Sequence, residues 1–190
     1  MPEPIIDQPN QQMRTYLPCA FLRTLRYYYQ RLRGAQIVPG AVLFAQVSLL
    51  RHVRKISIAQ DVVLKTGVHL CPCNPSAAIS IGARTTVGFY SMLYATSEII
   101  IGEDCMIAPF VYIVDSNHAR KKGKPMNQQA NISAPIHIGN DVWIGTHSVI
   151  LAGSVINDGA IIGAGSVVRG VVPANAIYSG IPAQQVGERQ

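Results

Sequence analysis

The sequence predicts an all-β fold, a parallel β-helix in which very short strands wind into a triangular coil. Aliphatic residues recur at every sixth position over long stretches, and small residues recur at fixed offsets from them. The count of six is interrupted at a few places only, which fits insertions at one corner of such a coil. A fixed repeat period is typical of solenoid architectures. We expect a short α-helical extension before the coils and an excursion loop at about residues 115–131.

The clearest run of the six-residue repeat begins at Ile132. Every sixth residue from there is isoleucine or valine: Ile132, Ile138, Ile144, Ile150, Ile156, Ile162 and Val168. A helix would need apolar residues at spacings of three and four, which this run does not supply. Period six instead predicts short strands joined by tight turns, with each aliphatic side chain pointing inward. A β-sandwich would show this spacing only by accident.

The same repeat runs upstream in groups of three. These groups are Ile37, Leu43 and Leu49; Ile58, Leu64 and Leu70; Ile81, Val87 and Leu93; and Ile101, Ile107 and Ile113. Three strands close one coil of a triangular prism, so each group predicts one coil. The spacing stretches between groups, as at residues 71–79, and it fails after Ile113. There we expect the loop to leave the core and Ile132 to resume it.

Length and composition restrict the class of protein. The chain has 190 residues, 48% of them hydrophobic and 14% charged, which argues against disorder and allows one domain with a sizeable core. We assign residues 1–36 to an N-terminal extension and residues 37–190 to the β-helix domain. The sequence has no run of eighteen apolar residues, and it does not start like a secretory signal. Its four cysteines predict free thiols, with Cys71 and Cys73 as a structural pair, so we expect a cytoplasmic protein.

Residues 18–33 predict a basic amphipathic helix that ends before Gly34. Its apolar residues Phe21, Leu25, Tyr28 and Leu32 fall on one face, and arginines lie largely on the other. The whole net charge of +6 resides in residues 1–60. We expect the apolar face to pack across the open end of the coils. The alternative is peripheral contact with an anionic membrane, where helices of this kind also lie.

Five motifs in the second half of the chain carry a family resemblance. In order they read IIIGEDCMIAP (99–109), DSNH (115–118), APIHIGNDVWIG (134–145), AIIGAGSVVRGVVP (160–173) and SGIPA (179–183). This order resembles the hexapeptide-repeat acyltransferases. It is closest to the maltose, galactoside and nodulation O-acetyltransferases and to the O-acetyltransferases of surface-polysaccharide biosynthesis. The resemblance implies a left-handed coil, although crossovers between parallel strands are usually right-handed.

His118 lies where that family keeps its catalytic histidine, at the start of the excursion loop. Transfer of an acetyl group from a thioester to a hydroxyl requires removal of the hydroxyl proton as the oxygen attacks. Imidazole is the side chain suited to this task near neutral pH. A backbone N–H at a turn would stabilise the negative charge that develops on the thioester oxygen. The resemblance thus implies that His118 is the general base.

The resemblance also implies acetyl-CoA as the acetyl donor, with no metal required. In the family the donor lies along the groove between adjacent subunits of a homotrimer. The matching positions in this chain are Thr146, Ala164, Arg169 and Gly170. The family often has lysine where this chain has Gly170 and arginine where it has Gln184. Arg169 would then take over part of the contact with the nucleotide phosphates.

The acceptor side departs further from the family, which carries an asparagine in a stretch that here reads GFYSMLYA (88–95). Tyr90, Ser91 and Tyr94 are polar alternatives for acceptor binding, although aromatic residues on coil faces also serve packing. Asp115 and Asn117 would orient the imidazole or meet a sugar hydroxyl, but as loop residues they equally form turns.

A basic cluster follows His118 and consists of Arg120, Lys121, Lys122 and Lys124. It would meet CoA phosphates or an anionic acceptor, or it lies in water as an ordinary loop tip. A γ-class carbonic anhydrase shares the fold but needs three zinc-binding histidines, two of them five residues apart. No such pair exists among His52, His69, His118, His137 and His147.

Together these features predict an acetyl-CoA-dependent O-acetyltransferase that acts on a sugar hydroxyl. The expected acceptor is a lipid- or nucleotide-linked sugar in the assembly of capsule, O-antigen or exopolysaccharide. Acetylation of a small xenobiotic, N-acetyl transfer to a sugar amine, and a non-catalytic β-helix scaffold remain the alternatives. We expect no nucleic-acid partner.

Overall fold

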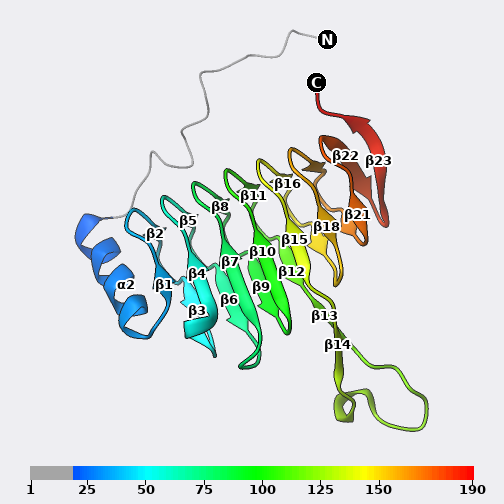
Figure 1. Cartoon of the computed structure of the whole chain (residues 1–190), viewed down its shortest axis with the longest axis horizontal. Helices are drawn as coiled ribbons and strands as arrows, with labels where there is room; N and C mark the ends of the chain where they lie inside the picture. The colour runs from blue at the N-terminus through cyan, green and yellow to red at the C-terminus, as the bar shows by residue number, and fades with distance from the viewer. Residues whose placement is uncertain (1–18) are drawn as a thin grey trace.

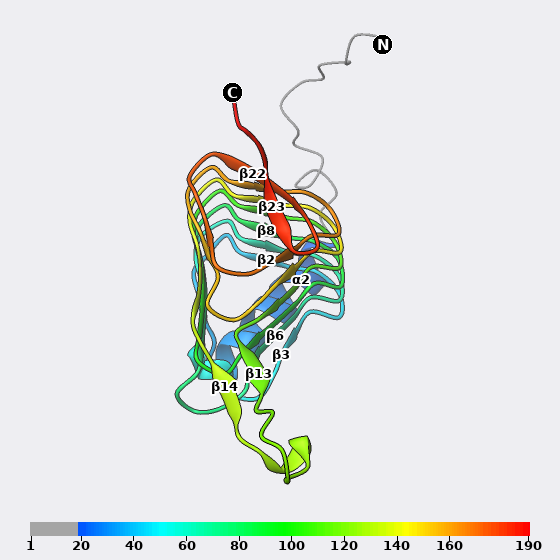
Figure 2. The ribbon, with the colours of Figure 1, turned by 90° about the vertical axis from the view of Figure 1, so that its right-hand side faces the viewer.

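The chain forms a left-handed parallel β-helix, described by a computed structural model for residues 19–190. After helix α2 (Ala20–Leu32) come six complete coils of three strands and a seventh coil of two (Figure 1). Figure 2 shows the coils from the end, stacked on one another around a common axis. The predicted fold class is therefore confirmed, including the helical extension and the excursion loop. The coiled part, residues 36–180, is called the solenoid.

Each coil contributes one strand to each of three parallel sheets. Sheet A contains β1 (Gln36–Ile37), β4 (Ile56–Ile58), β7 (Ala78–Ile81), β10 (Glu98–Ile101), β15 (Ile136–Ile138), β18 (Val155–Ile156) and β21 (Val171–Val172). Sheet B contains β2 (Val42–Leu43), β5 (Val63–Leu64), β8 (Thr86–Val87), β11 (Met106–Ile107), β16 (Trp143–Ile144), β19 (Ile161–Ile162) and β22 (Ala176–Gly180), with β23 (Ala183–Glu188) antiparallel to β22. Sheet C contains β3 (Ser48–Leu49), β6 (His69–Pro72), β9 (Met92–Ala95), β12 (Tyr112–Val114), β17 (Val149–Ile150) and β20 (Val167–Val168). Two 3₁₀ turns, η1 (Val53–Lys55) and η2 (Met126–Gln128), lie outside the sheets.

The core is a column of aliphatic side chains inside the prism. Equivalent residues of successive coils lie in register, so that Ile107 pairs with Ile144 and Ile144 pairs with Ile162. Every predicted inward residue is buried except Ile132. Outward neighbours alternate with these residues along each strand, so the six-residue repeat marks the central column of the core within the coils.

The prediction that Ile132 resumes the core is wrong. Ile132 is 64% exposed and lies in strand β14 (Asn131–Ser133), opposite Asn117 of strand β13 (Ser116–His118). These two strands form an antiparallel arm outside the prism, and the core resumes at Ile136 and Ile138. Ile132 keeps the six-residue phase, but the chain has already left the coil where it occurs.

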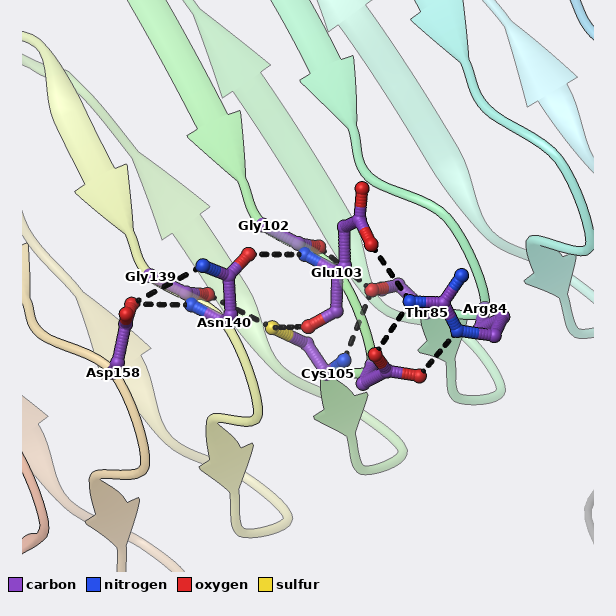
Figure 3. A network of polar contacts seen from close by, with 9 residues as sticks. Arg84, Thr85, Gly102, Glu103, Cys105, Gly139, Asn140 and Asp158 are labelled. Carbon is purple, nitrogen blue, oxygen red and sulfur yellow. Dashed lines mark hydrogen bonds and ion pairs between the residues drawn. The ribbon is translucent and has the colours of Figure 1, made fainter.

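The corner between sheets A and B is held by polar contacts that run from coil to coil (Figure 3). The Arg84 guanidinium donates to the carboxylates of Asp104 and Glu103, with N···O distances of 2.7 Å. Asn140 Oδ1 accepts from the backbone N–H of Glu103 at 2.9 Å, and Asp158 Oδ1 accepts from that of Asn140 at 2.7 Å. Very short strands leave turn N–H groups without ladder partners, and these side chains satisfy them. The contacts thus fix the register of the coils.

Helix α2 closes the N-terminal end of the solenoid, but with the opposite face from the one we expected. Gln30 is buried against the first coil, and the Tyr27 hydroxyl donates to the Ile37 carbonyl oxygen at 3.3 Å. The predicted packing face points away instead: Phe21 is 74% exposed and Leu32 is 88% exposed. Gly34 ends the helix with a φ of 101°, as predicted, and Pro18 lies outside the described residues.

The cysteines of the described chain are free thiols. Burial, and secondly the neighbouring Cys73, raise the pKa of Cys71 to about 11, so this thiol stays protonated near neutral pH. Cys73 Sγ lies 3.9 Å from Cys71 Sγ. Over residues 19–190, no group of three or more histidine, cysteine or acidic side chains is arranged to hold a metal ion.

Candidate active site

The arm that carries His118 leaves the solenoid at the corner between sheets C and A, directly after β12 (Figures 1 and 2). Strand β13 runs outward, η2 lies near the tip, and β14 returns antiparallel to β13. The pairing places Ser116 opposite Ser133 and His118 opposite Asn131. His118 is therefore held on a paired strand, rather than on an irregular loop as its sequence suggested.

Asp115 anchors the base of this arm. Its side chain is fully buried, and its carboxylate accepts from the backbone N–H groups of Thr96 at 2.6 Å and Ser97 at 2.7 Å. Its carbonyl oxygen accepts from the N–H of Ala134 on the returning strand at 2.9 Å. Burial raises the pKa of the Asp115 carboxyl group, while these N–H groups lower it. The geometry favours the turn-forming reading of Asp115 over contact with an acceptor.

Replacing Asp115 with alanine is expected to lower the free energy of unfolding by about 2–4 kcal/mol, since two interior N–H groups would lose their acceptor. Urea unfolding measures the change. Asn117→Ala, an exposed change on the same arm, is the control and is expected to shift stability by less than about 0.5 kcal/mol. A loss of activity in Asp115→Ala at unchanged stability would instead place the carboxylate at the reaction.

The side chain of His118 is exposed at the outer end of β13. Successive residues of a strand point to opposite faces, so Asn117 does not share the face of His118. Asn131, directly across the arm, does share it, and directly opposite residues have Cβ atoms about 5 Å apart. Sequence reasoning missed Asn131 because only the strand pairing brings it beside the histidine.

The proposed acceptor residues separate into different places. Ser91 is buried: its Oγ donates to the Ala108 carbonyl oxygen at 3.0 Å and accepts from the N–H of Val111 at 3.1 Å. Tyr90 lies at the corner between sheets B and C, where its ring stacks on Phe110 with centroids 5.7 Å apart. In this structure Ser91 ties coils together and Tyr90 belongs to an aromatic ladder, so neither lies beside His118.

Tyr94 lies closer to the arm, on the outer face of sheet C. It pairs with Val114, the last residue of β12, and its ring meets the edge of Tyr112 with centroids 6.1 Å apart. Burial raises the pKa of the Tyr112 hydroxyl, so this group remains a neutral hydrogen-bonding phenol near neutral pH. Sequence reasoning missed Tyr112, although its place just before the inward residue Ile113 marks it as outward-facing.

The four positions that we expect to bind the donor lie along the two edges of sheet C. Thr146 and Ala164 lie at its corner with sheet B, and the Thr146 hydroxyl donates to the Pro109 carbonyl oxygen at 2.7 Å. Arg169 and Gly170 lie at its corner with sheet A, the corner from which the arm departs. A Cβ atom on Gly170 would meet nothing within 4 Å, so the backbone there is open to a ligand. Within one chain these residues do not surround a common pocket.

The basic cluster occupies the tip of the arm, where all four side chains are exposed. Gln129 shapes the tip: its amide donates to the carbonyl oxygens of Lys121 at 3.0 Å and Lys124 at 2.7 Å, and it accepts from the Lys121 N–H. The other histidines lie on the solenoid rather than on the arm. Among them His147 stacks on Phe110, with ring centroids 5.0 Å apart.

Residues 135–170 match the family described as bacterial transferase hexapeptide (six repeats). The chain is 38% identical over 117 residues to nodulation protein L of Rhizobium meliloti, with 60% of this chain and 62% of that protein covered. It is 36% identical over 115 residues to the galactoside O-acetyltransferase of Escherichia coli, covering 58% and 54%. It is 35% identical over 106 residues to the putative lipopolysaccharide biosynthesis O-acetyl transferase WbbJ of Escherichia coli, covering 52% and 54%. The matches thus span less than two thirds of these relatives.

Solved structures share the fold. One is AntD, an N-acyltransferase from Bacillus cereus in complex with dTDP and 3-hydroxybutyryl-CoA, with a TM-score of 0.74, 21% identity, and 86% of this chain and 88% of that chain covered. Another is a maltose O-acetyltransferase from Clostridium difficile 630, with a TM-score of 0.62, 20% identity, and 94% and 81% covered. At 20–21% identity, the comparison with these two structures shows a shared coil architecture and nothing further.

Proposed function

We propose that this chain, a hexapeptide-repeat protein related to the O-acetyltransferases, transfers an acetyl group from acetyl-CoA to a sugar hydroxyl. The observation that carries the proposal is the placement of His118. The chain interrupts an otherwise regular coil to build a paired arm, anchors it with the buried Asp115, and presents one imidazole at the end of its first strand.

In the proposed reaction a nitrogen of His118 accepts the proton of the sugar hydroxyl while the hydroxyl oxygen attacks the thioester carbonyl carbon. The tetrahedral intermediate then collapses, the C–S bond breaks, and the CoA thiolate leaves with the proton returned by the imidazolium. No protein nucleophile is needed, since the acceptor oxygen itself forms the new ester bond. Asn131 lies on the same face of the arm and is suited to orient the imidazole or the acceptor.

The pair Tyr94 and Tyr112 offers a surface for the acceptor. Both lie on the outer face of sheet C, and β12, which carries Tyr112, leads directly into the arm. Aromatic rings that carry a hydroxyl combine an apolar face with a polar end, a combination suited to a sugar ring. In this proposal Tyr94 and Tyr112 take over the role in acceptor binding of the asparagine that the related sugar acetyltransferases carry in the stretch matching residues 88–95.

We further propose that three copies of the chain complete the site. His118 is exposed, and the donor-binding positions lie at opposite edges of sheet C, so a single chain supplies two open half-sites rather than a pocket. A neighbouring copy against sheet C would convert these edges into grooves. Light scattering is expected to give the mass of a trimer.

The acceptor is a sugar carried on a lipid or nucleotide in surface-polysaccharide assembly. The support is the similarity to WbbJ, whose name refers to lipopolysaccharide biosynthesis, and to galactoside O-acetyltransferase. Measurement of CoA thiol release over free sugars, nucleotide sugars, amino sugars and hydroxylated antibiotics tests the proposal. We expect turnover with hydroxyl-bearing sugars. Turnover restricted to amino sugars would contradict O-acetyl transfer and indicate N-acyl transfer, the activity named for AntD. Turnover of antibiotics alone would exclude a sugar acceptor.

A further inference from the structure

Helix α2 lies at the N-terminal end of the solenoid (Figure 1), and its outward face is an apolar stripe. It consists of Phe21, Leu22, Leu25, Tyr28, Tyr29 and Leu32, all exposed. Their spacing of three, four and seven residues places them on one side of the helix. Soluble proteins rarely expose contiguous apolar surface of this extent unless a partner or another phase covers it. None of the other described residues, 33–190, covers the stripe.

The inward face of the same helix is polar, which makes the arrangement costly for an isolated chain. Gln30 is buried and accepts at its side-chain oxygen from Arg33 Nη1 at 3.0 Å. Arg26 Nη1 is buried and has no hydrogen-bond partner among the described residues. A helix that only capped the solenoid would be more stable with its apolar stripe turned inward. The opposite orientation leaves the stripe open to a partner beyond the described residues.

The surface next to the stripe is strongly basic. Residues 19–60 contain seven lysines and arginines and neither aspartate nor glutamate. Four of these basic residues and one histidine line a cavity of about 440 Å³ beside the C-terminal end of the helix, here called the basic pocket: Arg33, Arg51, His52, Arg54 and Lys55. The side chain of Arg54 packs against Gly34, the residue at which the helix ends, so the pocket adjoins the C-terminal end of α2.

We propose that the apolar stripe and the basic pocket together dock this end of the protein onto a bilayer that contains anionic lipid. The stripe would enter the boundary between head groups and acyl chains, and the pocket would receive lipid phosphates. An amphipathic helix with apolar and aromatic residues on one side and arginines beside them is suited to this interface. Tyr28 and Tyr29 combine apolar rings with hydroxyl groups that remain in the head-group region.

Charge argues for lipid over the other occupants of such a face. A second copy would bring two surfaces of the same sign together, which opposes association. A nucleic acid would meet the basic pocket but would leave the apolar stripe in water. Only an anionic bilayer satisfies both features at once, since each basic residue near its surface adds attraction while the acyl boundary covers the stripe. The inference does not depend on the proposed acetyl transfer.

Flotation of the full chain with vesicles tests the proposal. We expect binding to vesicles of phosphatidylcholine with one quarter phosphatidylglycerol, much weaker binding to pure phosphatidylcholine, and release at high salt. The double change Phe21→Ser with Leu25→Ser, and separately the triple change Arg51→Gln, Arg54→Gln and Lys55→Gln, should each weaken binding at least about tenfold. These side chains are exposed, so both variants should keep the circular dichroism of the parent.

Matched controls are available elsewhere on the molecule. The double change Ile181→Ser with Val186→Ser removes similarly exposed apolar side chains at the other end of the solenoid. The triple change Arg120→Gln, Lys121→Gln and Lys122→Gln removes the same charge from the tip of the arm. Both control variants should bind vesicles like the parent. Absence of vesicle binding, or equal binding by all variants, would overturn the proposal. A lower subunit number for the Phe21/Leu25 variant in light scattering without lipid would also overturn it, because the stripe would then join copies of the chain. Acetyl transfer to a soluble acceptor should be the same in all these stripe and pocket variants.

Discussion

We expect His118→Ala to lower kcat for acetyl transfer by about 10²–10⁴-fold, the usual contribution of a general base. In the proposed reaction the imidazole takes the hydroxyl proton, and alanine would leave only water to do so. Release of CoA thiol under saturating acetyl-CoA measures the rate. Because the side chain is exposed and β13 is held by backbone pairing with β14, the arm should keep its structure.

His147→Ala is the matched control for this change. His147 is also an exposed histidine of the same half of the chain, but it belongs to the aromatic ladder at the corner between sheets B and C. His147 Nδ1 lies 2.9 Å from Thr146 Oγ1, so its loss is expected to act on the KM for acetyl-CoA, whereas kcat at saturating acetyl-CoA should change by less than about threefold. Light scattering should give the same mass for both variants. Near-full activity of His118→Ala, or an equal loss in both variants, would contradict the assignment of the base.

Ile138→Ala is expected to lower the free energy of unfolding by about 2–5 kcal/mol, whereas Ile132→Ala should change it by less than about 0.5 kcal/mol. Both residues occupy the same phase of the six-residue repeat. Ile138 is 2% exposed and packs in the column between coils, so alanine there leaves a cavity. Ile132 lies on the arm, where its side chain already contacts water.

Urea unfolding of the two variants in parallel separates these effects, because the substitution is chemically identical. The midpoint of Ile138→Ala should fall at an unchanged slope, which reports stability rather than a change in the surface exposed on unfolding. Equal destabilisation by both variants would mean that Ile132 packs in the core after all. That result would contradict the description of residues 116–133 as an arm outside the prism.

The column of the solenoid core could be predicted from the sequence because the six-residue repeat marks an inward position in every strand of the coils. Ile107, Ile144 and Ile162 stack in register at the spacing that the repeat dictates. The same reasoning failed at Ile132, because phase along the sequence does not show whether the chain is still in the coil. The antiparallel pairing of β13 with β14 takes the chain out of the coil at this point, and such pairing leaves no six-residue pattern in the sequence.

The orientation of α2 could not be predicted for a related reason. Amphipathicity shows which residues share a face, as it does for Phe21 and Leu25, but it does not show what that face meets. We assumed that the nearest apolar surface was the end of the solenoid. The first coil instead receives Gln30 and Tyr27, and it leaves the apolar stripe outside.

For the candidate site, the order of the five motifs was enough to predict the position of His118 and of the excursion loop. The sequence also indicated Tyr94 as a polar residue on a coil face. It did not show that Asp115 and Ser91 turn inward, because a polar side chain in a tight coil serves buried N–H groups as readily as a ligand. Asn131 and Tyr112 were missed, since only the arm and the stacking of coils place them beside the histidine and Tyr94.

Analysis of the product by mass spectrometry and NMR tests the central claim most directly. The protein is incubated with acetyl-CoA and the best hydroxyl acceptor of the panel, and the acetylated atom is identified. The account predicts that the product gains one acetyl group on a sugar oxygen, as an ester that dilute alkali removes, and that His118→Ala yields none above background. An acetyl group on nitrogen, or consumption of acetyl-CoA without any acetylated sugar, would contradict it.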